Sequence, residues 1–217
     1  MTTFIQRYLD PADRLGEILF GLIMALGFTG AVRLGVEDAD NRTLFISILG
    51  CNIAWAIVDG VMYVLTALFE QGRKARLVRD VRAAPSEASA LALVGNEFDD
   101  QLESLLTTDQ RGQFYRSVLT AVRQAEREPP RVRRDDLLGG VAVALIIVLA
   151  TLPIVVPYLL VPDPNLAVRV SNVVALTLVF LLGMRWGHVV GGRSLRIATG
   201  LTVLGVVLVL ITIVLGG

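Results

Sequence analysis

Five apolar stretches, each long enough or nearly long enough to cross a bilayer, constrain this chain more than any other feature. A transmembrane helix needs about 20 consecutive, mostly apolar residues. The stretches cover residues 18–32 (or 18–36, with Arg33 reaching the interface), 44–69, 137–162, 166–184 and 197–217. We therefore expect an all-α integral membrane protein with five transmembrane helices.

Charge is concentrated between the second and third stretches. Residues 70–136 carry 12 of the 20 Lys and Arg residues and 12 of the 20 Asp and Glu residues. This division predicts three parts: residues 1–69 with the first two spans, a helical insert at 70–136, and residues 137–217 with the last three spans.

Basic residues in the short connections predict the orientation, because Arg and Lys gather on the cytoplasmic side of membrane proteins. Basic clusters precede the first and third stretches, follow the second, and separate the fourth from the fifth. The connections at 37–43 and 162–165 are acidic or nearly neutral. We therefore expect a cytoplasmic N-terminus, a cytoplasmic insert and a C-terminus on the outer side.

Apolar residues recur every three or four positions from residue 87 to residue 106, which indicates an amphipathic helix in the insert. A second helix is expected after the capping residue Thr107. The polar face of the first helix carries Glu97, Asp100 and Glu103, with Asp99 beside them. Such carboxylates can bind a divalent cation, but an ordinary solvated face has the same composition, so both interpretations stay open.

Asp59 is the one charged residue in the second stretch and the most informative residue in the sequence. A carboxylate near the centre of a span costs roughly 2.5–3.5 kcal/mol. Asn52 and Thr66 lie seven residues to either side, so the three share one helix face, with Met62 beside it. This stripe indicates a transport path. A structural hydrogen bond between helices, with Asp59 protonated, is the open alternative.

Glu17 stands at the start of the first stretch, after two aspartates that fit helix capping. Met24 follows it by seven residues, near the depth of Asp59. The first two helices thus offer Glu17 and Met24 opposite Asp59 and Met62. Carboxylate and thioether groups together suit a borderline divalent metal such as Fe²⁺ or Mn²⁺, although each methionine also fits ordinary apolar contact.

Several function classes are disfavoured by the sequence. It has no nucleophile–base pair, glycine-rich phosphate loop, CxxC or HExxH pattern, so we expect neither an enzyme nor a tightly bound cofactor. The formal net charge is zero, which argues against nucleic acid as a partner. Pro153 and Pro157 should bend the third span, either for close fit or as a hinge.

Two segments resemble the vacuolar iron transporter family. Residues 14–24 (RLGEILFGLIM) are similar to the opening of its first span, and residues 49–60 (LGCNIAWAIVDG) to the second span of bacterial relatives. The resemblance implies a homodimer that exports Fe²⁺ or Mn²⁺ from the cytoplasm in exchange for protons, here in a bacterial inner membrane. The family's Asp–Gly pair is replaced by Met24–Ala25, so Asp59 is expected to supply the pore carboxylate instead.

The expected function is therefore export of a divalent transition metal. The path is predicted to involve Asp59, Asn52, Glu17, Met24 and Met62. Metal ligands are expected at Asp59, Glu17, Glu97, Asp100 and Glu103. Lipid, metal ion, protons and a second copy are the expected partners. The alternative is a membrane protein that transports nothing and whose insert binds a partner.

Overall fold

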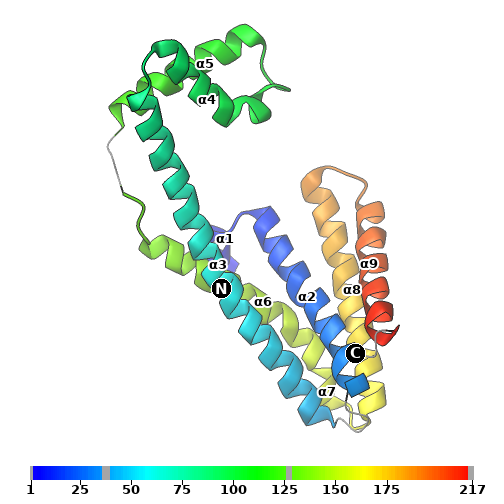
Figure 1. Ribbon diagram of the computed structural model, residues 1–217. Helices are drawn as coiled ribbons and strands as arrows, with labels where there is room; N and C mark the ends of the chain where they lie inside the picture. Colours follow the sequence, from blue (N-terminus) through cyan, green and yellow to red (C-terminus); the bar gives the residue numbers. More distant parts are fainter. Residues whose placement is uncertain (1, 36–39, 126–128, 215–217) are drawn as a thin grey trace. The chain divides into compact units, whose positions relative to one another are not determined.

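The computed structural model describes residues 2–35, 40–125 and 129–214, leaving aside the side chains of residues 2, 3, 28–35, 212 and 213. This part of the chain is all-helical (Figure 1). It divides into two units. Residues 1–64 and 134–217 form the first, called here the membrane unit, and residues 65–133 form the second, called the insert unit.

Nine helices are present in the described residues, and four stretches among them are long and apolar enough to cross a membrane. These four are α3, α6 with α7, α8, and α9. The chain is therefore an all-helical, multi-pass membrane protein. The first expected span falls in α2, whose side chains are described only as far as Gly27. The helices are α1 (Thr2–Tyr8), α2 (Pro11–Gly35), α3 (Asn41–Ala83), α4 (Glu87–Leu102), α5 (Thr108–Gln124), α6 (Arg134–Val155), α7 (Pro157–Leu160), α8 (Pro164–Val190) and α9 (Ser194–Val214).

Aspartates cap the starts of α2 and α3. The Asp10 carboxylate accepts a hydrogen bond from the Asp13 backbone N–H at 2.9 Å, which confirms its expected capping role. Asp40 accepts one from the Thr43 N–H at 2.8 Å. Hydrogen bonds from Thr43 hold the pKa of Asp40 below its usual range, so this exposed carboxylate stays ionised.

The third expected span is interrupted near its end. Pro153 lies inside α6, and α7 begins at Pro157 after a break at Val156. Proline has no backbone N–H, so Pro157 cannot continue the hydrogen-bond ladder of α6. The helix is therefore interrupted at the second proline, while Val156 keeps helical dihedrals (φ −55°, ψ −41°), and the expected bend stays a prediction.

Small residues let the helices of the membrane unit approach closely. A Cβ added at Gly140 on α6 would lie 2.5 Å from the carbonyl oxygen of Gly60 on α3, and one added at Gly60 would lie 2.7 Å from that of Gly140. α8 and α9 meet in the same way at Gly183 and Ala198. Lipid is as apolar as the helix surfaces, so close van der Waals contact of this kind must supply much of the association energy.

The insert unit is held by a conventional hydrophobic core. Val81, Ala90, Val94 and Leu119 are buried there, contributed by the end of α3 and by α4 and α5. Capping boxes begin α4 (Ser86 with Ser89) and α5 (Thr107 with Gln110). The amphipathic helix expected from residue 87 is confirmed, but it ends at Leu102, and Leu105 is left 74% exposed.

Candidate functional site

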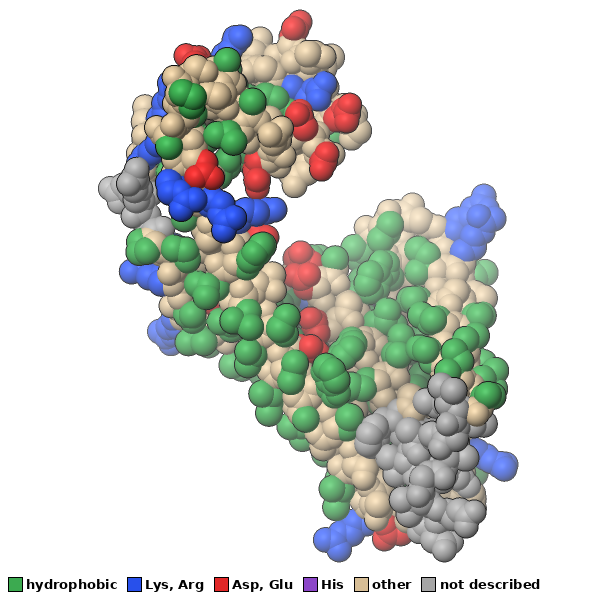
Figure 2. Space-filling view, in the orientation of Figure 1, with side chains coloured by type: hydrophobic (Ala, Val, Ile, Leu, Met, Phe, Trp, Pro, Cys, Tyr) green, Lys and Arg blue, Asp and Glu red, His purple; other side chains and the backbone are tan. Residues whose placement is uncertain are grey.

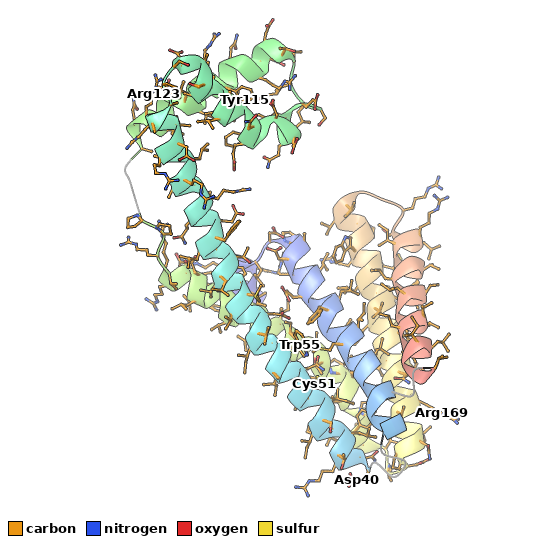
Figure 3. All side chains as sticks on the ribbon, in the orientation of Figure 1. Asp40, Cys51, Trp55, Tyr115, Arg123 and Arg169 are labelled. Atoms are coloured by element: carbon orange, nitrogen blue, oxygen red, sulfur yellow. The ribbon has the colours of Figure 1, made fainter. Side chains whose placement is uncertain are left out.

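Asp59 lies on the part of α3 that belongs to the membrane unit, one turn after Trp55 (Figure 3). Its side chain is partly exposed, and its Oδ2 atom is buried without a hydrogen-bond partner among the described residues. The residues around it on α3 are apolar, and several of them are exposed, as expected for contact with lipid. The Oδ2 atom of Asp59 therefore receives no hydrogen bond from the described residues of its own helix.

Glu17 of α2 is the acidic neighbour of Asp59. The two carboxylates lie within range of Coulombic repulsion, and Asp13 adds a third negative charge that also acts on Glu17. The ring of Phe20 on α2 packs edge-on against Trp55 of α3, with centroids 6.1 Å apart, so the two helices adjoin at this level. The structure thus places Glu17 within Coulombic range of Asp59, on adjoining helices.

In the part of the chain that the structure describes, no basic side chain forms an ion pair with either acid, Glu17 or Asp59. Figure 2 shows acidic side chains amid hydrophobic ones on the membrane unit. A pair of carboxylates in such surroundings favours a proton or a cation, because either one relieves both the repulsion and the cost of burial.

Negative charge continues toward the start of α2. Burial, together with repulsion from Asp10, raises the pKa of Asp13. The charges of Asp13 and Asp136 both act on the phenol of Tyr63, whose hydroxyl donates to the Tyr8 carbonyl oxygen at 3.2 Å. Acidic side chains of α2 and α6 thus both act electrostatically on Tyr63 of α3.

Asn52 is fully buried and bonded within the protein. Its Nδ2 donates to the Ile48 carbonyl oxygen at 3.0 Å, and its Oδ1 accepts from the Thr151 hydroxyl at 3.1 Å. Thr151 lies on α6, so this bond joins α3 to α6. Thr151 was not among the residues predicted from the sequence. The available signal was a hydroxyl residue in an otherwise apolar stretch.

The two methionines expected on the path lie in different surroundings. Met24 is partly buried in α2. Met62 is 53% exposed and lies among other exposed apolar residues of α3, including Val58 and Leu65. Thr66, the last member of the expected polar stripe, is exposed as well. Within the described residues, the stripe therefore turns from the helix contact toward the outer surface after Asp59.

The acidic residues of the insert unit are partly engaged by arginines. Glu97 lies 3.4 Å from the Nε of Arg73, and Asp99 lies 3.2 Å from Arg111 and accepts a hydrogen bond from Tyr115. Asp100 and Glu103 are exposed. In the described ranges, no three His, Cys, Asp or Glu side chains converge in a geometry able to hold a metal ion.

The arrangement can therefore exchange a proton or a cation at one place in the membrane unit, between α2 and α3.

No protein-family model matches this sequence, and no curated protein matches it either.

Proposed function

We propose that the chain is a five-span transporter that exports a divalent transition metal, Fe²⁺ or Mn²⁺, from the cytoplasm in exchange for protons. The observation that carries the proposal is the Asp59 carboxylate. It lies in an apolar, membrane-long helix, has an oxygen with no hydrogen-bond partner in the described residues, and has Glu17 within range of Coulombic repulsion. A carboxylate in such surroundings costs free energy, and ionisable residues in membrane helices are rare unless they have a function.

Charge balance supports a divalent substrate. Two carboxylates can hold two protons or one divalent cation and are neutral in both states. Binding of the metal ion would displace one proton from each of Glu17 and Asp59, and release would return two protons. Burial and mutual repulsion both favour the neutral states, so the pair would favour exchange over an empty, doubly ionised state. Met24, which is partly buried in α2, would add a thioether ligand, whereas Met62 lies on the exposed surface of α3.

The proposed topology places the N-terminus and the insert at residues 70–136 in the cytoplasm and the C-terminus outside, in a bacterial inner membrane. It rests on the basic clusters that flank the apolar stretches and on α2 as the fifth span. The proposal also includes a homodimer, as the resemblance of residues 14–24 and 49–60 implies. The exposed apolar side chains of α3 are compatible with lipid or with a second copy.

Metal flux into proteoliposomes tests the proposal directly. Asp59→Asn removes the titratable group with little change of shape and should abolish proton-coupled uptake of Fe²⁺ and Mn²⁺. Asp109→Asn is the matched control, because Asp109 is exposed in the first turn of α5. Unchanged coupled flux in Asp59→Asn would remove Asp59 from transport and, with it, the proposal.

A second candidate is a membrane protein that transports nothing and whose insert unit binds a partner. The ion pairs of Glu97 and Asp99 favour it, because they occupy carboxylates that a metal-collecting insert would keep free. Thermal melting separates the two candidates. A stabilising shift with Fe²⁺, Mn²⁺, Co²⁺ or Zn²⁺ that Asp59→Asn abolishes supports the transporter, and no shift supports the second candidate.

A further inference from the structure

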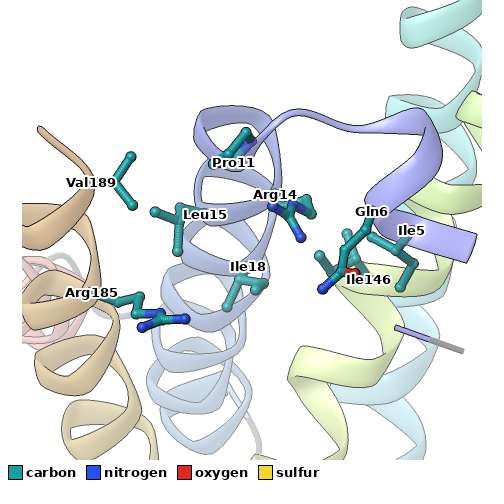
Figure 4. A pocket seen from close by; sticks show the side chains of 9 residues that line it. All are labelled: Ile5, Gln6, Pro11, Arg14, Leu15, Ile18, Ile146, Arg185 and Val189. Atoms are coloured by element: carbon teal, nitrogen blue, oxygen red, sulfur yellow. The ribbon is translucent and has the colours of Figure 1, made fainter. Parts of the chain in front are cut away.

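A cavity of about 500 Å³ lies in the membrane unit, near the start of α2 and the end of α8 (Figure 4). Residues of α1, α2, α6 and α8 line it, and neither Glu17 nor Asp59 is among them. The volume is in the range of small-molecule binding sites. The transport proposal makes no use of this cavity.

Basic and apolar side chains line the cavity together. Arg14 of α2 and Arg185 of α8 supply two positive charges, and the lining contains no acidic side chain. Among the described residues, neither arginine takes part in an ion pair. Most of the other lining residues are apolar, including Leu15, Ile18 and Ile146. The cavity therefore matches a ligand with an anionic group and an attached apolar part.

Both arginines lie close to helix ends, within a distance that matches the thickness of a headgroup layer. At 1.5 Å per residue, Arg14 is about 5 Å from the start of α2, and Arg185 is about 8 Å from the end of α8. A headgroup layer is roughly 5–8 Å thick on each side of the hydrocarbon. Ile18 lies one turn beyond Arg14 along α2, which places apolar lining deeper than the charge.

We propose that this cavity binds one anionic phospholipid, with Arg14 and Arg185 at its phosphate and Ile18 beside the start of an acyl chain. Basic pockets between transmembrane helices are known to hold acidic headgroups, because the guanidinium group forms paired hydrogen bonds with phosphate oxygens. Gln6 of α1 also lines the cavity and would add a polar contact. A bound lipid would bridge α2 and α8. The site requires only that the chain is a membrane protein, not that it transports metal.

Lipid titration of the purified full chain in a neutral detergent tests the site. Phosphatidylglycerol should raise the melting temperature and be retained in native mass spectra, whereas phosphatidylcholine should do neither. In the double variant Arg14→Gln/Arg185→Gln, affinity for phosphatidylglycerol should fall about 25-fold, at about fivefold per arginine. The matched control is Arg193→Gln/Arg196→Gln, because these two exposed arginines flank the start of α9 at the same end of α8 and do not line the cavity.

A second pair of variants keeps the charges and changes only the space. Val189 lines the cavity and is 51% exposed, whereas the adjacent Val190 is 63% exposed and does not line it. Val189→Trp should occupy part of the cavity and weaken retention of phosphatidylglycerol at least tenfold, while Val190→Trp should leave it unchanged. These variants keep the test valid if loss of Arg14 impairs folding.

Three results would overturn the proposal. In the first, both double arginine variants weaken binding equally, which would indicate general attraction to a basic surface. In the second, Val189→Trp binds the lipid as well as the unaltered chain does. In the third, inorganic phosphate stabilises the protein as strongly as phosphatidylglycerol, which would make the cavity a site for a free anion.

Discussion

In the insert unit, Glu97 and Asp99 lie against Arg73 and Arg111, whereas in the membrane unit Glu17 and Asp59 lie near each other without a basic partner among the described residues. The first arrangement is what water-exposed helices commonly adopt, and each such pair contributes little. Two neighbouring carboxylates without a basic partner cost free energy inside a membrane, where little water can solvate them. In the proposed function, the acidic groups of the membrane unit offset this cost by binding protons or a metal ion.

Different interactions also hold the helices together in the two units. α3 and α6 approach through glycine and share the buried Asn52–Thr151 bond, whereas the insert unit encloses a small core of aliphatic side chains. Hydrophobic burial drives association in water but not in lipid, where steric fit and hydrogen bonds decide. Substitutions should therefore lower stability through loss of steric fit in the membrane unit and through loss of hydrophobic burial in the insert unit.

The largest expected effect follows from separating α3 and α6. Gly140→Leu places a side chain against the Gly60 carbonyl and should lower the free energy of unfolding by about 3 kcal/mol. Unfolding in mixed detergent–SDS micelles measures this loss. Gly200→Leu is the matched control, because a Cβ at Gly200 on α9 meets nothing within 4 Å. Equal stability of the two variants would show that close backbone approach does not hold the membrane unit together.

A smaller loss is expected from the core of the insert unit. Leu119→Ala removes a side chain that is 3% exposed and should destabilise this unit by about 2 kcal/mol. Limited proteolysis should then cleave within residues 65–133 more readily, with the membrane unit unaffected. Thr120→Ala, at an exposed position of the same helix, should cleave like the unaltered chain. Parallel loss in both units would contradict their separate stabilisation.

Replacement of Asp59 is expected to raise stability, in contrast to the two substitutions above. Asp59→Asn removes a charge that has no counter-ion among the described residues and is repelled by Glu17, so the free energy of unfolding should rise by about 1 kcal/mol. SDS unfolding at pH 7 measures the gain. A loss of stability instead would show that Asp59 makes a structural hydrogen bond, which was the alternative left open by the sequence.

The smallest effect is expected at a paired acid. Glu97→Gln breaks a partly exposed ion pair with Arg73 and should change the stability of the insert unit by less than about 0.5 kcal/mol. Thermal melting followed by circular dichroism is sensitive enough to place this limit. A loss of 2 kcal/mol or more would show that this ion pair is a major structural contact, and the contrast between the units would weaken.

Features carried by one helix at a time could be predicted from the sequence. The apolar stretches, the Asp10 cap, the break near Pro157 and the helix after Ser86 each depend on residues close together in the chain. Asp59 was identified for the same reason, because a charge in an apolar stretch stands out without any knowledge of its neighbours.

Features that depend on how helices rotate against each other could not be predicted. The hydrogen bond from Thr151 to Asn52 and the contact of Gly60 with Gly140 each join α3 to α6. Exposure of Met62 likewise depends on which face of α3 meets its neighbours. A rotation of one residue, about 100°, would change all three without altering the hydropathy pattern.

Asn41, at the start of α3, donates from its Nδ2 to the Val161 carbonyl oxygen at 2.6 Å, across 120 positions of the chain. A ribosome adding 5–20 residues per second needs roughly 6–24 s to make that many. The acceptor does not exist when α3 is first made, so this polar end of the helix must remain hydrated during that interval. We therefore expect the hydrogen bond at the start of α3 to form late in biosynthesis, after the third apolar stretch has left the ribosome.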